Sequence, residues 1–268
     1  MNTDAASPLE IVESIPPDCI DVLLQIEQDQ SWIRVSEARG IRWLQIGGES
    51  VQSLMAIDAP AKLLLPNHIA MLFGSLLIDE PEDVLCMGLG GGCFERFFAE
   101  YYPHCRLTSV ESNTEVISVA RDYFGIPLEV NVASARAEYF IETSSDRFDL
   151  IFCDIFEHEN HPECLVENTF YRHSSRCLKP GGVLVLNILQ GLDNKLFRIL
   201  KSLRMSFASV YLCTIDNRGN VIVVASNGKD VPSTEILRRT KNLAENSGVD
   251  MTDWIDRFAL VPEKRQSV

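Results

Sequence analysis

The sequence lacks the features that mark an exported or membrane-inserted protein. No apolar run approaches the roughly 20 residues that a helix needs to span a bilayer. Residues 1–10 contain neither a basic segment nor the apolar core of an export signal. The eight cysteines include no Cys-x-x-Cys pair, and Cys86 and Cys153 lie inside apolar runs. We therefore expect reduced core thiols, a cytoplasmic location and no membrane partner.

Positive charge is also scarce, since 24 Lys and Arg residues stand against 38 Asp and Glu residues, a formal net charge of −14. An acidic surface repels the phosphate backbone of DNA and RNA, so we expect no nucleic-acid partner. The same surface would attract a small cationic substrate. The alternative interpretation is that most of these charges only keep the protein soluble.

Residues 1–60 predict a small β-rich domain. Short runs, several of which alternate apolar and polar residues, are separated by glycine turns. These runs cover residues 19–27, 32–38, 41–46 and 51–56. They are typical of an antiparallel β-unit, with room for a short leading helix. The second domain is expected over residues 61–268, and it opens with a mostly apolar stretch, 61–78, that is long enough for a helix.

From Glu82 onward, apolar strands alternate with helical stretches. The predicted strands cover residues 84–88, 106–110, 128–133, 148–153 and 182–188. The predicted helices between them cover residues 93–102, 113–122, 135–142, 168–178 and 194–204. Continuous apolar strands joined by helical crossovers indicate a parallel sheet that is covered on both faces.

The C-terminal part departs from this alternation. Two strand patterns, 209–216 and 220–226, are joined by a short Asn-Arg-Gly turn and predict an antiparallel hairpin. A further charged, amphipathic helix is expected over residues 233–246. A mostly parallel, seven-stranded sheet that ends in such a hairpin resembles the class I AdoMet-dependent methyltransferase fold. The predicted fold class is thus α/β, a Rossmann-like domain with a small N-terminal β-unit.

The most informative stretch is Val84-Leu-Cys-Met-Gly-Leu-Gly-Gly-Gly-Cys93, an apolar strand that runs into a glycine-rich turn before a helix. Glycine has no Cβ and lets a ligand approach the backbone closely. The next strand ends on Glu111, roughly 20 residues after the first glycine, where a carboxylate can bind both hydroxyls of a ribose. We therefore predict a nucleoside site at Gly88, Gly90, Gly91 and Glu111. The alternative is a tight turn without a ligand, and the lack of a following Lys-Ser or Lys-Thr pair excludes a P-loop.

Asp154 closes the run Phe148-Asp-Leu-Ile-Phe-Cys-Asp, at the C-terminal end of the predicted fourth strand. In open α/β sheets, ligands bind beyond the carboxyl ends of the strands, so Asp154 should lie near Glu111 and the glycine turn. A carboxylate beside a reactive carbon can orient and deprotonate an attacking amine. The alternative is that Asp154 only caps the strand end in solvent.

The loop after the fourth strand contains residues of metal-ligand type, among them Glu157, His158, His161 and Cys164. Metal sites need a rigid, well-spaced set of ligands, whereas this polar loop is interrupted by Pro162. We interpret the loop as a substrate-binding segment and expect no metal.

Several motifs follow one another in the order and spacing of the spermidine synthase family, the polyamine aminopropyltransferases. They are Leu85-Cys-Met-Gly-Leu-Gly-Gly-Gly, Ser109-Val-Glu111, Phe148-Asp-Leu-Ile-Phe-Cys-Asp154, and Thr169-Phe-Tyr-Arg with Cys177-Leu-Lys-Pro-Gly-Gly182. Upstream, Gly48-Glu-Ser-Val-Gln52-Ser-Leu-Met resembles the end of that family's N-terminal β-domain. The resemblance implies transfer of an aminopropyl group from decarboxylated AdoMet to an amine or polyamine, in a homodimer that needs no metal.

The resemblance also implies roles for single residues. Glu111 matches the acid that binds the ribose, and Asp154 matches the aspartate that activates the attacking amine. Gln52 matches a glutamine near the cofactor. Glu157 falls where the family has a second acid for the polyamine, and Tyr171 falls near an aromatic residue that lines the substrate channel.

Some positions depart from the family's pattern. Gly91 stands where the family has the aspartate that binds the amino group of the decarboxylated donor, so nothing at this position would repel the carboxylate of intact AdoMet. Ser134 replaces the acid that binds adenine, and it can still bond the adenine edge, though less strongly. The family's tyrosine before the core appears as Asn67 or His68. Two other hypotheses therefore stay open, an AdoMet-dependent methyltransferase and a non-catalytic homologue that binds an adenosyl ligand.

Overall fold

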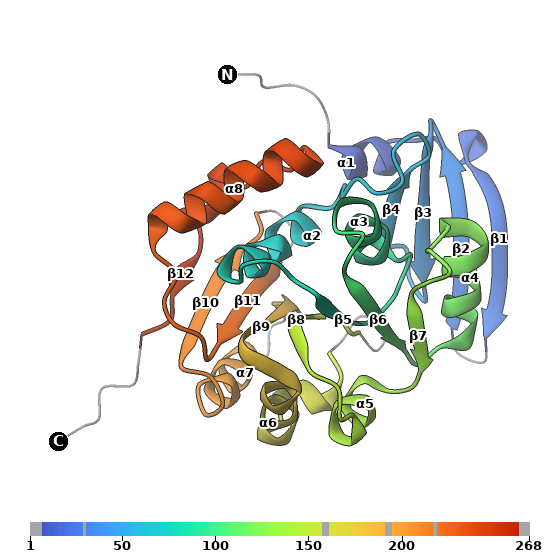
Figure 1. Cartoon of the computed structure of the whole chain (residues 1–268). Helices are drawn as coiled ribbons and strands as arrows, with labels where there is room; N and C mark the ends of the chain where they lie inside the picture. Colours follow the sequence, from blue (N-terminus) through green and yellow to red (C-terminus); the bar gives the residue numbers. More distant parts are fainter. Residues whose placement is uncertain (1–6, 29–30, 157–160, 191–194, 217–218, 263–268) are drawn as a thin grey trace.

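Two sheets organise the chain, as the computed structural model shows (Figure 1). The structure describes residues 7–28, 31–156, 161–190, 195–216 and 219–262. The N-terminal part begins with helix α1 (Pro8–Glu13) and the 3-10 turn η1 (Pro17–Cys19). It continues with strands β1 (Asp21–Gln28), β2 (Ser31–Ala38), β3 (Ile41–Ile46) and β4 (Val51–Ala56). These strands pair in chain order and antiparallel, as the alternating pattern predicts.

The larger sheet has eight strands in the order β12-β10-β11-β9-β8-β5-β6-β7. Their bounds are β5 (Asp83–Met87), β6 (Arg106–Glu111), β7 (Asn131–Ser134), β8 (Phe148–Cys153), β9 (Leu178–Leu189), β10 (Ser209–Thr214), β11 (Asn220–Ser226) and β12 (Ala259–Leu260). Strands β5 to β9 are parallel, and β11 pairs antiparallel with both β9 and β10. The predicted α/β fold with its C-terminal hairpin is confirmed. The short edge strand β12, which pairs with β10, adds an eighth strand to the seven that were expected.

The helices of this part lie between and after the strands. They are α2 (Pro66–Met71), the 3-10 helix η2 (Leu72–Leu77), α3 (Cys93–Tyr101), α4 (Thr114–Phe124), α5 (Ala137–Thr143), the 3-10 turn η3 (Glu163–Val166), α6 (Asn168–Cys177), α7 (Lys195–Leu203), α8 (Ser233–Ser247) and α9 (Thr252–Ile255). Among the residues with described structure, no helix is both long enough and apolar enough to cross a membrane.

The single helix expected over residues 61–78 is wrong in detail. The α-helix begins only at Pro66, because proline fits the first turn, where its missing N–H is not needed. After Met71 the helix tightens into η2, where a Cβ on Gly74 would lie 2.3 Å from a Val185 methyl group. The backbone at Gly74 therefore packs directly against the sheet.

Both faces of the larger sheet are buried, which accounts for its continuous apolar strands. Along β8, for example, Leu150 and Phe152 face the side that is covered by η2, α3 and α8, and Ile151 and Cys153 face the side that is covered by α5, α6 and α7. Figure 1 shows these two layers of helices above and below the sheet.

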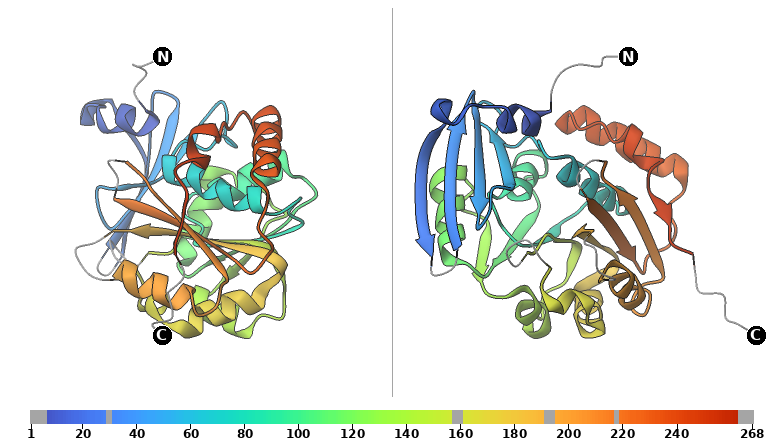
Figure 2. Two further views of the ribbon diagram at one scale, coloured as in Figure 1. Left: turned by 90° about the vertical axis from the view of Figure 1, so that its left-hand side faces the viewer. Right: turned by 180° about the vertical axis from the view of Figure 1, so that it is seen from behind.

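The N-terminal sheet packs against helix α4 at one end of the molecule (Figure 2). Buried side chains of the N-terminal strands, including Ile33 and Leu44, form one apolar cluster with Val116, Val119 and Phe124 of the helix. The Arg42 guanidinium also donates to the carbonyl of Tyr123. This packing brings β4 beside the glycine turn that follows β5.

Candidate active site

The predicted site residues gather at the carboxyl edge of the parallel strands. Glu111 is the last residue of β6, and it stands in register with Ser134, the last residue of β7. Asp154 follows β8 directly, and its N–H donates to the carbonyl of Met87 at 2.8 Å. Parallel strands end at the same edge of a sheet, which is why acids far apart in sequence come together here.

The glycine turn joins the two acids. A Cβ on Gly88, whose φ is +89°, would lie 2.2 Å from the carbonyl oxygen of Asp154, so only glycine fits. The next residue, Leu89, donates its N–H to Glu111 Oε2 at 3.2 Å. The backbone of Asp154 and the carboxylate of Glu111 therefore both lie next to the Gly88–Leu89 peptide.

The Glu111 carboxylate is oriented before any ligand binds. Besides the bond from Leu89, its Oε1 accepts the N–H of Asn113 at 2.9 Å. An ionised carboxylate offers about four acceptor positions, so this half-buried group retains capacity for further donors.

Gly91, which the sequence predicts in the nucleoside site, packs against β4 and α4. Its N–H donates to Ser53 Oγ at 2.9 Å, and its carbonyl accepts from the buried Arg96 guanidinium. A Cβ at this position would lie 2.9 Å from Ser53 Cβ and 3.1 Å from the Phe124 ring. An acid at position 91 would therefore point at β4 and α4, and both would have to move to admit it.

Asp154 is held by partners on both carboxylate oxygens. Asn187, on β9, donates to Oδ1 at 2.8 Å, and Nε2 of His68, on α2, lies 3.3 Å from Oδ2. Asn187 is itself fixed by Asn220, which donates to its Oδ1 at 2.9 Å. The side chain of Asp154 retains 19% exposure, so the carboxylate is fixed in direction and still reachable.

His68 connects Asp154 to a thiol. The imidazole is 4% exposed, and its Nδ1 lies 3.3 Å from the sulfur of Cys93, the first residue of α3. Burial lowers the pKa of His68, but the Cys93 sulfur and the Asp154 carboxylate outweigh burial and raise the pKa to about 10. The ring also packs against Phe94 at a centroid distance of 5.4 Å.

The other predicted residues are placed less uniformly. Gln52, on β4, donates to the carbonyl of Ile46 at 3.2 Å. Tyr171 is fully buried in the core, and its hydroxyl donates to the carbonyl of Leu165 at 2.5 Å. The structure therefore does not bring Tyr171 to the strand ends, where the resemblance implied a channel-lining role. Glu157 lies outside the described residues.

The ligand-type residues of the loop after β8 are only partly described, because His158 lies outside the described residues. His161 is buried, its Nε2 accepts the N–H of Leu189 at 2.6 Å, and burial lowers its pKa. Among the residues that the structure describes, none is a hydrogen-bond partner of its Nδ1. Within the part of the chain that the structure describes, no three His, Cys, Asp or Glu side chains are grouped to hold a metal ion.

Two polar residues that contact this group, Asn187 and Cys93, were not predicted from the sequence. Asn187 is a lone amide in the apolar run 183–188, and such an interruption is a signal that a buried partner exists. Cys93 gave no such signal, because a buried cysteine usually packs as a small apolar residue.

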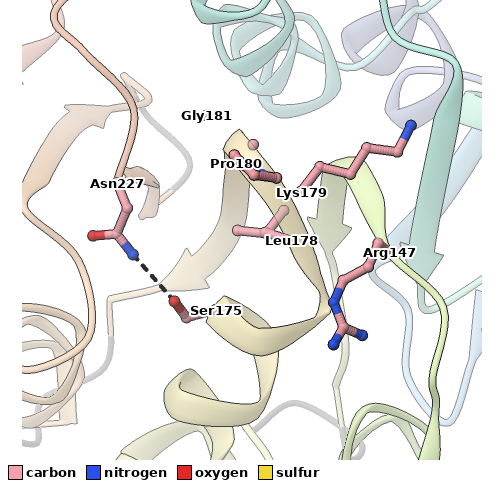
Figure 3. A pocket seen from close by; sticks show the side chains of 8 residues that line it. Arg147, Ser175, Leu178, Lys179, Pro180, Gly181 and Asn227 are labelled. Atoms are coloured by element: carbon pink, nitrogen blue, oxygen red, sulfur yellow. Dashed lines mark hydrogen bonds between the residues drawn. The ribbon is translucent and has the colours of Figure 1, made fainter.

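A hollow at the opposite edge of the sheet does not belong to this site. Figure 3 shows Arg147, Ser175, Lys179 and Asn227 around it, with Asn227 donating to Ser175 at 3.1 Å. The hollow lies where β9 begins, whereas Asp154 and Asn187 lie where β8 and β9 end. The Lys179 ammonium is paired with Asp83 and Asp149.

Comparison with known proteins identifies the family of this chain. Residues 84–182 match the family model described as a methyltransferase domain. The polyamine aminopropyltransferase of Neisseria meningitidis serogroup A is 32% identical over 225 residues, which cover 81% of this chain and 85% of the relative. That of Chromobacterium violaceum is 31% identical over 231 residues, which cover 84% of this chain and 88% of the relative.

A solved structure of a probable spermidine synthase from Corynebacterium glutamicum covers 91% of this chain and 98% of its own, with a TM-score of 0.72 and 21% identity. At that identity the likeness supports the fold, while the two curated relatives support the family. The chain belongs to the polyamine aminopropyltransferase family.

Proposed function

We propose that this protein transfers an aminopropyl group from decarboxylated AdoMet to an amine acceptor, with Asp154 as the general base. Membership of an enzyme family supports this proposal. The observation that supports it is that the Glu111 carboxylate and the Asp154 backbone both lie next to the Gly88–Leu89 peptide. One acid can bind the nucleoside of the donor while the other faces its reactive carbon.

The residues present fit an adenosyl ligand. Glu111 is preoriented by two backbone N–H groups and retains acceptor positions for two ribose hydroxyls. Ser134, in register beside it and exposed, can offer a hydroxyl to the adenine edge. The glycine turn between the two acids lets the ligand approach the backbone.

In the transfer step, the acceptor nitrogen attacks the carbon bonded to the donor sulfonium. The new C–N bond forms as the C–S bond breaks, and the electron pair of that bond goes to sulfur, which leaves as the thioether methylthioadenosine. The nitrogen gives its proton to Asp154, which passes it to solvent. Asn187 and His68 hold the carboxylate in direction, so that positioning and base catalysis act together.

The test is a product assay. Purified protein is incubated with decarboxylated AdoMet and putrescine or spermidine, and methylthioadenosine and the aminopropylated amine are measured by mass spectrometry. Asp154→Asn keeps the size of the side chain but cannot accept the proton, so kcat should fall by about 10²–10⁴ while donor affinity stays nearly unchanged. Asp122→Asn, an exposed position on α4, is the matched control and should retain full kcat.

The outcomes separate the hypotheses. Full activity of Asp154→Asn would contradict the assigned base. Methyl transfer from intact AdoMet, without consumption of the decarboxylated donor, would favour a methyltransferase. Binding of either donor without turnover would favour a non-catalytic homologue. A run with each donor also measures donor choice. The family resemblance implies affinities within about tenfold of each other, roughly 1.4 kcal/mol, and a larger difference would mean that residues other than position 91 select the donor, which the packing of Gly91 against β4 and α4 favours.

The acceptor is proposed to be a polyamine, whose positive charge suits a chain of net charge −14. Glu157 is proposed to bind its remote amine, so Glu157→Gln should mainly raise KM. Two further expectations, a cytoplasmic location and a homodimer, are carried over from the cysteine pattern and from the family resemblance. Light scattering of the purified protein measures the second.

A further inference from the structure

Three side chains from three segments contact one another in a row that ends at Asp154, the proposed base. The sulfur of Cys93 lies 3.3 Å from Nδ1 of His68, and Nε2 of the same ring lies 3.3 Å from Oδ2 of Asp154. Both ring nitrogens thus have one polar neighbour each, and the ring is buried. The arrangement has the order thiol, imidazole, carboxylate.

The thiol and the Asp154 carboxylate both act on the position of the imidazole proton. If His68 is neutral, the Cys93 S–H donates to Nδ1, and the ring proton must then be on Nε2, which faces Asp154. If the thiol proton passes to the ring, both nitrogens carry protons, and Nε2 still donates to Asp154. In either state a donor faces the carboxylate, and the ionised carboxylate is the form that it stabilises.

We propose that Cys93, acting through His68, is a positioning residue that keeps a proton on Nε2 and so keeps Asp154 ionised to receive the proton of the attacking amine. The inference rests on the proposed function of Asp154 as general base. Without the thiol, a bare Nε2 can face Asp154, and that state favours the protonated carboxyl group, which cannot act as a base. The raised pKa of His68, to about 10, agrees with this geometry.

Other ionisable groups lie near Cys93 and Asp154, but they do not take the place of the Cys93 thiol at His68. His161 and Cys153 are close enough to Asp154 to interact with it electrostatically. Cys86 and Arg96 interact in the same way with Cys93. Among the described residues, the ionisable side chains that act on His68 itself are Cys93, at Nδ1, and Asp154, at Nε2.

The test compares Cys93→Ala, which removes the donor, with Cys93→Ser, which restores an O–H donor at the same place. The control is Cys213→Ala, which removes another buried thiol from the same apolar cluster. If Cys93→Ala does not fold, Cys93→Val replaces it, because valine keeps the volume without a donor. The protonation of the His68 ring is read by ¹⁵N NMR, with the signal assigned by its loss in His68→Gln.

The wild type, Cys93→Ser and Cys213→Ala should all retain the Nε2 proton from pH 6 to pH 9, whereas Cys93→Ala should lose it within that range. In the turnover assay, the acid limb of the plot of kcat against pH should move toward neutrality by about one pH unit in Cys93→Ala. At a pH below the midpoint of that limb, kcat should therefore fall about tenfold. It should stay in place in Cys93→Ser and in the control.

Two results would overturn the inference. One is an unchanged ring and an unchanged acid limb in Cys93→Ala, and the other is a serine variant that behaves like alanine, because a merely structural role would not be rescued by an O–H donor. Each of the two proposals can be refuted without the other. If the wild type turns over neither donor, the proposed function fails, and the NMR comparison still decides whether Cys93 controls the His68 proton.

Discussion

Replacing Glu111 tests the adenosyl site at the residue that should bind the ribose. In the structure its carboxylate accepts the N–H groups of Leu89 and Asn113 and retains positions for two ribose hydroxyls. Glu111→Gln keeps the shape of the side chain, removes its charge, and turns one acceptor oxygen into an NH₂ group. Glu111→Ala removes the acceptors altogether.

The magnitude follows from the bonds involved. Hydrogen bonds to a charged group contribute about 1.5–3 kcal/mol each and are roughly twice as strong as neutral ones. Glu111→Gln weakens one ribose bond and replaces the other acceptor by a donor. We therefore expect the affinity for methylthioadenosine to fall at least tenfold, or about 1.4 kcal/mol, and to fall further in Glu111→Ala.

Calorimetric titration with methylthioadenosine measures this effect. Glu115→Gln is the matched control, because Glu115 lies in the exposed first turn of α4, and its variant should bind as the wild type does. Thermal unfolding of each variant shows whether the loss of acceptors for the Leu89 and Asn113 N–H groups has loosened the turn. Affinity within threefold of the wild type in both Glu111 variants would refute the assignment of Glu111 as the ribose-binding acid.

Two further predictions concern stability. Because the pKa of His68 rises to about 10 on folding from an ordinary value near 6.5, its proton stabilises the folded state fully below about pH 6.5 and progressively less as the pH rises toward 10. Urea unfolding should therefore show the wild type losing stability from pH 6.5 to 9.5 more steeply than His68→Gln, and equal slopes would contradict this. Gly88→Ala should lower the free energy of unfolding by about 2–4 kcal/mol, since it combines strain at positive φ with a clash against Asp154. Gly40→Ala, at positive φ in open space, should cost only the strain, and an equal loss in both variants would refute the steric argument.

The parallel half of the fold could be predicted from the sequence because its strands are buried on both faces. Strand β8 was predicted at the bounds that the structure shows, Phe148–Cys153, since an apolar run between polar residues leaves little choice of limits. The same topology predicted that Glu111 and Asp154 would be neighbours. Parallel strands end at one edge, so knowledge of the ends was enough to place both acids there.

Other features depend on contacts between segments that the sequence does not relate. The direction of Gly91 is set by Ser53 on β4 and by the Phe124 ring, and neither position could be inferred from the motif. Tyr171 lies in the core because its hydroxyl finds a partner in Leu165, six residues away on the preceding turn. The two-residue strand β12 is too short to produce an alternating pattern.

A series of polar side chains links the hairpin to the candidate active site. Asn220, Asn187, Asp154, His68 and Cys93 follow one another through side-chain contacts from the hairpin to the glycine turn. A buried polar group that loses its partner costs about 1–3 kcal/mol, so each member restricts the conformation of the next. Because these contacts begin on β11 and end on α3, β11 must pair with β9, and β9 with β8, before the contacts can fix the direction of the Asp154 carboxylate. The pairing of β11 and the orientation of Asp154 are therefore coupled, although Asn220 and Asp154 lie more than sixty residues apart along the sequence.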